Sequence, residues 1–117
     1  MKTILIVEDI ELNIDLLTQL LEDDYNLLVA KNGEQGVSVA QQENPDLILM
    51  DVSLPIMDGY EATRRIRATM PSTPIIGLSA HAMSGDEEKA KEAGCNDYLT
   101  KPVNADLLIK KVKEYLR

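Results

Sequence analysis

Four of the five short apolar runs in the sequence lead into, or end in, a side chain that can bind a cation or a phosphoryl group. Glu8 and Asp9 follow the first run, Asp51 follows the third, Ser79 ends the fourth, and Lys101 follows the fifth. Three carboxylates brought together repel one another unless a cation lies among them. Carboxylate oxygens in an open arrangement suit Mg²⁺, which also binds phosphate oxygens. The residue types therefore predict a magnesium site that handles a phosphoryl group.

The same set assigns a nucleophile. Asp51 follows the most central apolar run, so its carboxylate is the natural acceptor, and the product would be an aspartyl phosphate. Lys101 would supply the charge opposite to a phosphoryl group, and the Ser79 hydroxyl would donate to it. Any one of these residues is common in a loop after a strand, so the hypothesis depends on their joint placement. Phosphoryl transfer asks a protein mainly for positioning and charge neutralisation.

The sequence contains few ligands for metals such as zinc. The only histidine is His81 and the only cysteine is Cys95, which excludes an internal disulfide and the usual zinc ligand sets. We expect Cys95 to be a small buried hydrophobic residue.

The elements that must position these residues alternate along the chain. Apolar runs typical of strands buried on both faces occupy 3–7, 25–30, 47–50, 75–78 and 98–100. Helix-like segments occupy 12–22, 34–43, 60–69, 86–93 and 105–116. Asn32, Ser84 and Asn104 are the predicted N-caps of three helices, and Gly94 is a predicted C-cap. The alternation predicts an α/β fold with a parallel sheet and helices on both faces. The carboxyl ends of parallel strands meet at one edge, where ligands bind.

Composition limits the possible partners and the location. The chain has 117 residues, which fits one domain over 1–117, and a net charge of -8 from 20 acidic and 12 basic residues. This balance argues against partners with phosphate backbones, so we expect no nucleic acid, and against anionic membrane surfaces. No apolar stretch approaches the roughly 20 residues of a membrane span, and the N-terminal apolar run is too short for a signal peptide. We expect a cytoplasmic protein.

Four segments together resemble the receiver domain of two-component response regulators. They are 4–9 (ILIVED), 45–59 (PDLILMDVSLPIMDG), 78–80 (LSA) and 93–102 (AGCNDYLTKP), and the resemblance covers essentially the whole chain. The segment 79–83 is most similar to receivers attached to, or partnered with, hybrid histidine kinases. The resemblance implies a flavodoxin-like, five-stranded parallel sheet in the order 2-1-3-4-5 with five flanking helices. It also implies a phosphohistidine donor on a histidine kinase or phosphotransfer protein, and a downstream protein target.

The resemblance also implies the roles of individual residues. Asp51 accepts the phosphoryl group, and Asp9 and Asp51 bind Mg²⁺ together with the backbone carbonyl of Ser53. Glu8 stands where Asp is commoner in the family, and it would help to hold the metal through water.

A second set of implied roles concerns the response to phosphorylation. Lys101 pairs with the phosphoryl oxygens, Ser79 moves to donate to them, and Tyr98 follows as an aromatic switch. From its place in the sequence alone, Tyr98 could equally be a strand aromatic that covers the sheet. The Lys101–Pro102 peptide bond is expected to be cis. His81 is interpreted as an exposed loop residue, and the alternative is a residue that borders the phosphoryl group and tunes its hydrolysis.

Several alternative functions remain at this point. The chain could be a free receiver or a receiver module of a larger hybrid kinase, and in neither case an enzyme beyond its own phosphorylation and dephosphorylation. A phosphatase of the haloacid dehalogenase type would need an acid two residues after Asp51, where Ser53 stands. A flavin-binding module would need a phosphate loop where Glu8 and Asp9 stand. A purely structural receiver is disfavoured by the complete set of site residues.

Helix 12–22 carries a second candidate surface. At about 100° per residue, one stripe should face the sheet: Ile10, Asn13, Ile14, Leu17, Leu20 and Leu21. Leu12 and Leu16 are four residues apart and fall on the other side, as neighbours on the helix surface. We predict that they form, with Asn13 beside them, a docking patch for the phosphohistidine donor. The alternative is that the last helix partly covers both leucines.

Overall fold

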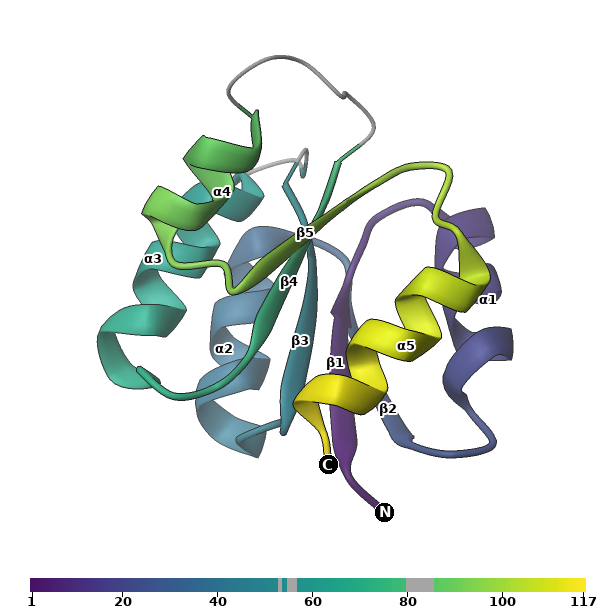
Figure 1. The fold of residues 1–117 in the computed structure, drawn as a ribbon. Helices are drawn as coiled ribbons and strands as arrows, with labels where there is room; N and C mark the ends of the chain where they lie inside the picture. Colours follow the sequence, from purple (N-terminus) through teal and green to yellow (C-terminus); the bar gives the residue numbers. More distant parts are fainter. Residues whose placement is uncertain (53, 55–56, 80–85) are drawn as a thin grey trace.

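The computed structural model describes residues 1–52, 54, 57–79 and 86–117, and in these residues five strands alternate with five helices (Figure 1). The strands are β1 (Thr3–Val7), β2 (Asn26–Ala30), β3 (Leu47–Asp51), β4 (Ile75–Ser79) and β5 (Asp97–Thr100). The helices are α1 (Glu11–Leu21), α2 (Gly33–Glu43), α3 (Gly59–Thr69), α4 (Asp86–Ala93) and α5 (Ala105–Tyr115). All ten predicted elements are present, with ends that differ by one residue at most.

The strands form one parallel sheet in the order β2-β1-β3-β4-β5, which confirms the order implied by the resemblance. After β1 the chain moves outward to β2 and then returns to place β3 on the other side of β1. The strand order therefore reverses between β1 and β3, and ligands of such sheets bind outside the carboxyl ends at that point.

Alternate residues of the sheet feed two separate cores. Leu5 and Val7 of β1 belong to the core that contains Ile66 of α3, whereas Ile4 and Ile6 belong to the core on the opposite face. Figure 1 shows the corresponding helices: α2, α3 and α4 cover one face, and α1 and α5 cover the other. All four of these β1 side chains are fully buried. This is why the central strands read as uninterrupted apolar runs.

Local signals in the sequence fix several helix ends. The side chains of Asn32 and Asn104 accept hydrogen bonds from the N–H groups of Gln35 (2.8 Å) and Leu107 (3.0 Å), so both predicted N-caps are confirmed. Gly94 follows α4 with φ 117°, a left-handed conformation that favours glycine. The predicted cap at Ser84 lies outside the described residues, as does His81.

The prediction that Ile10 belongs to the sheet-facing stripe is wrong. Ile10 is 52% exposed, while Ile14, Leu17 and Leu21 are buried as expected. The cause is that Ile10 is the N-cap of α1, with extended backbone angles (φ -90°, ψ 117°), so the helical period does not yet apply to it. None of the helices in the described part of the chain has the length and apolar content needed to span a bilayer.

Candidate functional site

The predicted site residues gather at the carboxyl edge of the sheet, as their positions after the strands required. Adjacent strands are in register there, with Val7 beside Met50, Asp51 beside Leu78, and Ser79 beside Thr100. Residues far apart in the sequence therefore lie within hydrogen-bond distance at this edge.

Glu8 is a fully buried acid whose carboxylate accepts three hydrogen bonds. Its Oε2 accepts hydrogen bonds from the N–H groups of Asp9 (2.9 Å) and Ile10 (3.3 Å), and its Oε1 accepts one from Lys101 Nζ (2.5 Å). Burial first, and then the neighbouring Asp51 carboxylate, raise the pKa of Glu8, and the Lys101 ammonium only partly opposes them. The longer side chain of Glu allows the carboxylate to fold back onto its own backbone and still reach the lysine.

Lys101 lies between two carboxylates. Its Nζ donates to Glu8 and also to Asp51 Oδ2 at 3.1 Å. Burial alone would lower the pKa of Lys101, but hydrogen bonds and charges from the two carboxylates outweigh it, so the pKa is raised. The backbone N–H of Lys101 donates to the Ser79 carbonyl (2.7 Å), and the Lys101–Pro102 peptide bond is cis as predicted.

Asp51 ends β3 and is 2% exposed. The chain returns to it at Gly59, the first residue of α3. A Cβ atom built on Gly59 would lie 2.2 Å from the Asp51 carbonyl oxygen and 2.4 Å from Val52 Cα. Only glycine allows this approach, so α3 begins in direct contact with the backbone of Asp51, the predicted acceptor.

Ser79 and Tyr98 lie on neighbouring strands, β4 and β5. Ser79 is 2% exposed at the end of β4. Tyr98 is half-buried and packs against the core under α2, α3 and α4. A Cβ atom built on Gly77 would lie 3.6 Å from the ring of Tyr98, an ordinary van der Waals distance, so the ring lies close to the Gly77 backbone of β4. The ring thus covers the sheet here, and its role as a switch stays a prediction.

The acidic cluster fits a divalent cation. Glu8, Asp9 and Asp51 each offer a carboxylate oxygen, and these oxygens lie within 4.8 Å of one another. Asp9 is exposed while the other two are buried, so the cluster opens to water on the Asp9 side. Hard oxygen ligands with room for water are what Mg²⁺ requires. Ser53, the predicted fourth contributor, lies outside the described residues.

The predicted docking residues lie next to this site. Leu12 is 76% exposed and Leu16 is 43% exposed, so the alternative in which α5 covers both leucines is wrong for Leu12. A pocket begins beside Leu16 and Asn13 and reaches Lys101. Its lining comprises Glu8, Asn13, Leu16, Leu17, Leu78, Lys101, Pro102 and Val103. Asn13 and Leu16 of the predicted patch thus line the same pocket as Glu8 and Lys101.

Comparisons with known proteins agree with this geometry. The family model described as the response regulator receiver domain matches residues 4–113. The chain belongs to that family. A polar-differentiation response regulator of Brucella anthropi, DivK, is 38% identical over 98% of this chain and 96% of its own length. The protein is thus a receiver of the two-component phosphorelay type.

Two solved receiver structures are similar in both fold and sequence. One is the receiver domain of a sensor histidine kinase from Pseudomonas aeruginosa, with a magnesium ion coordinated in its active-site cleft. It is 39% identical with a TM-score of 0.90, and the match covers 97% of this chain and 96% of that one. The other is the receiver domain of Ssk1 from Saccharomyces cerevisiae, co-crystallised with the histidine phosphotransfer protein Ypd1. It is 35% identical with a TM-score of 0.91, and the match covers 97% and 88% of the two chains.

Two features of the site were not anticipated from the sequence. The first is the bond between Glu8 and Lys101, because Glu8 was expected to act towards the metal alone. The second is the close approach of Gly59 to the backbone of Asp51, which no prediction from the sequence included. Asp58 caps α3 by accepting a hydrogen bond from the N–H of Glu61 at 2.9 Å, so the cap itself does not require a glycine at position 59. The glycine was therefore the signal in the sequence for a close backbone approach.

Proposed function

We propose that this receiver accepts a phosphoryl group on the carboxylate of Asp51. The observation that carries the proposal is a buried carboxylate at a strand end, ion-paired with Lys101 and within 4.8 Å of two further acids. In the reaction, an Asp51 oxygen forms a bond to phosphorus while the bond between phosphorus and the donor breaks. Outside this self-phosphorylation and the later loss of the group by hydrolysis, we propose no enzymatic activity.

Mg²⁺ is the cofactor in this proposal, held by Asp9 and Asp51, with Glu8 next to it and the Ser53 carbonyl as a further ligand. The ion would neutralise charge between the acids and the incoming phosphoryl group. The chain's own groups do the rest: Lys101 Nζ is already 3.1 Å from Asp51 Oδ2 and can turn to a phosphoryl oxygen. Ser79 would donate its hydroxyl to the same group, and Tyr98 would follow it inward.

The donor we propose is a phosphohistidine on a helical kinase or phosphotransfer domain. The support is the exposed pair Leu12 and Leu16, beside a pocket that leads to Lys101. A donor helix that covers these leucines would bring its histidine towards Asp51. The Ssk1 receiver, which this chain resembles, was crystallised with such a phosphotransfer protein. Output would follow through contact with a downstream protein.

The location we propose is the cytoplasm. The support is Cys95, a free buried thiol and the only cysteine in the sequence, which is the usual state of cysteine in a reducing compartment.

Intact-protein mass spectrometry tests the proposal directly. Incubation with acetyl phosphate and Mg²⁺ should add one phosphoryl mass to the wild-type chain. Asp51→Asn should remain unlabelled, and EDTA should prevent labelling of the wild type. Glu61→Gln, a change of the same type at an exposed acid, is the matched control and should label normally. Labelling of Asp51→Asn, or labelling that EDTA does not affect, would contradict the proposal.

A further inference from the structure

Arg67, near the end of α3, ties together two loops at the end of the sheet away from the phosphoacceptor, the loop between α3 and β4 and the loop between α4 and β5. Its Nε and Nη2 donate to the Gly94 carbonyl (3.2 and 2.7 Å), and Nη2 also donates to Asn96 Oδ1 (2.8 Å). Its Nη1 donates to the carbonyls of Met70 (2.9 Å) and Thr73 (2.7 Å). All three guanidinium nitrogens are therefore engaged, which is an arrangement that the planar fork of Arg allows and a Lys ammonium does not.

Through Asn96 this arrangement reaches two strands. The Asn96 N–H donates to the Ile75 carbonyl (2.7 Å), and Asn96 Oδ1 accepts from the Ile75 N–H (2.9 Å). Ile75 is the first residue of β4, and Asn96 directly precedes β5. Arg67 thus holds the point from which both strands start.

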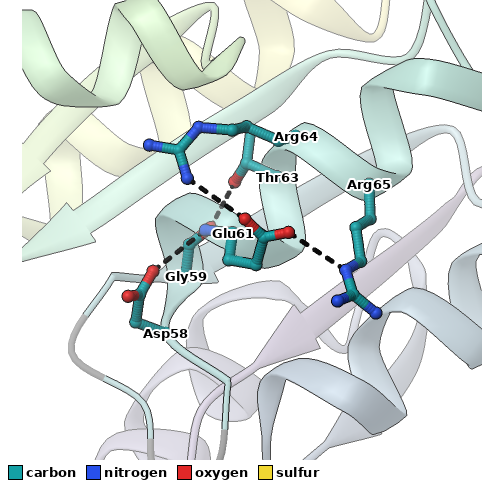
Figure 2. Close-up of polar contacts among 6 residues, drawn as sticks. All are labelled: Asp58, Gly59, Glu61, Thr63, Arg64 and Arg65. Atoms are coloured by element: carbon teal, nitrogen blue, oxygen red, sulfur yellow. Dashed lines mark hydrogen bonds and ion pairs between the residues drawn. The ribbon is translucent and has the colours of Figure 1, made fainter.

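The opposite end of α3 touches the phosphoacceptor. Gly59 approaches the Asp51 carbonyl so closely that a Cβ atom would lie 2.2 Å from it. Thr63 is fully buried, donates its hydroxyl to the Gly59 carbonyl at 2.6 Å (Figure 2), and lies 3.9 Å from Cys95 Sγ. Gly59, Thr63 and Arg67 are spaced by four residues, so they share one face of α3.

The side chains on the outer face of α3 behave differently. Figure 2 shows Arg64 and Arg65 turned towards Glu61, with which they form exposed ion pairs of 3.4 and 3.1 Å. Arg65 therefore offers a control for Arg67: the same residue type on the same helix, without contact to the loops that start β4 and β5.

β5 needs such an anchor. It is a four-residue edge strand that carries Tyr98 and is followed at once by Lys101. The neighbouring α4 buries little apolar surface, since Ala90 and Ala93 are its buried residues among those described. From the other face, Asp97 is held by Lys111 of α5 (2.9 Å). The start of β5 is thus clamped by polar groups from α3 on one face and from α5 on the other.

We propose that Arg67 is a positioning residue for the phosphoryl site. A rigid 11-residue helix, roughly 16 Å long, would run from Asp51 to the start of β5 and set where Tyr98 and Lys101 lie relative to the acceptor. This inference rests on the proposed phosphorylation of Asp51. It adds a residue remote from the reacting atoms, which acts through the turn 94–96.

The test compares Arg67→Met with two controls. Arg65→Met removes the same charge from the exposed face of α3. Leu21→Ala removes buried apolar surface on the far face of the sheet, and urea is used to compare its loss of stability with that of Arg67→Met. Each variant is labelled with acetyl phosphate and Mg²⁺. The amide resonances of Tyr98 and Lys101 are followed by NMR before and after addition of Mg²⁺ with beryllofluoride, a phosphoryl mimic.

We expect Arg67→Met to be labelled about tenfold more slowly, because small displacements of positioning groups have effects of that order or larger. The Tyr98 and Lys101 resonances should shift by less than half of the wild-type change. Arg65→Met and Leu21→Ala, measured under conditions where they are folded, should keep the wild-type rate and shifts. Arg67→Lys keeps the charge but not the fork, so it should resemble Arg67→Met.

Three results would overturn the inference: wild-type rate and shifts in Arg67→Met, full recovery in Arg67→Lys, or an equal loss in Leu21→Ala at matched stability. Failure of the wild type to be labelled would instead contradict the proposed phosphorylation. Labelling of the wild type together with an unaffected Arg67→Met would contradict only the role of Arg67.

Discussion

Replacing Lys101 by Met should leave two buried acids without their shared cation. Lys101 Nζ lies 2.5 Å from Glu8 Oε1 and 3.1 Å from Asp51 Oδ2, and the lysine side chain is 15% exposed. Removing one partner of a buried ion pair costs about 3–5 kcal/mol. Glu8 keeps its two backbone donors after the change, so we expect the lower end, about 3 kcal/mol. A domain stability of about 5–15 kcal/mol would still leave the variant folded.

Urea unfolding in EDTA measures this effect, and a loss of about 3 kcal/mol would move the midpoint by roughly 1–3 M. Lys113→Met, at an exposed position of α5, is the matched control and should move it little. In an Asp51→Asn background the same Lys101→Met change should cost at least about 1 kcal/mol less, because only one of the two acids that contacted the lysine is then charged. Equal losses in both backgrounds, or a loss no larger than that of Lys113→Met, would refute the shared-cation reasoning.

Two further predictions concern the surface and the pH dependence. The double change Leu12→Asp with Leu16→Asp should slow transfer from a protein phosphohistidine donor at least about tenfold but spare labelling by acetyl phosphate. Val29→Asp, at another exposed apolar residue, is the control and should affect neither reaction. Equal loss with both donors would indicate misfolding. Burial alone would raise the pKa of Asp97, but donors from Lys111, the Tyr98 N–H and Tyr115 outweigh it and hold that pKa below its usual range. The Asp97 carboxylate therefore stabilises the fold above about pH 4, and this contribution is lost as the pH falls below that value. We expect Asp97→Asn to be less stable than the wild type by roughly 1 kcal/mol at pH 7. Urea titrations at pH 3 should show a smaller difference.

The fold could be predicted from the sequence because its signals are local and agree with one another. Residues 4–7 and 47–50 are apolar without interruption, as is typical of strands buried on both faces. The caps at Asn32 and Asn104 and the glycine at 94 mark helix ends through their own hydrogen bonds and backbone angles. The prediction for Ile10 failed because this residue is the N-cap of α1, and its backbone is extended rather than helical. The spacing of apolar residues does not reveal at which residue the helical conformation begins.

The sequence predicted which residues form the site, but not which of them form ion pairs with one another. Strand ends converge in any parallel sheet, so the positions of Asp51 and Lys101 in the sequence sufficed to bring them together. Which carboxylate the lysine prefers depends on side-chain length and burial, and the sequence carries no separate signal for either. The contacts of Arg67 are still harder to predict, because all of its acceptors except Asn96 Oδ1 are backbone carbonyls, which every residue has.

The distribution of stability in this chain connects its fold to its function. The central strands fill both cores with fully buried Ile and Leu side chains, while the carboxyl edge buries Glu8 and Asp51 next to each other. Burial and mutual repulsion make such acids unfavourable, and a single lysine cannot neutralise both. The edge therefore lowers the stability that the cores supply, and a divalent cation bound there would stabilise the folded state by mass action. Such a cation would act on the balance of charge at the edge, while the two cores hold the strands that position Glu8 and Asp51.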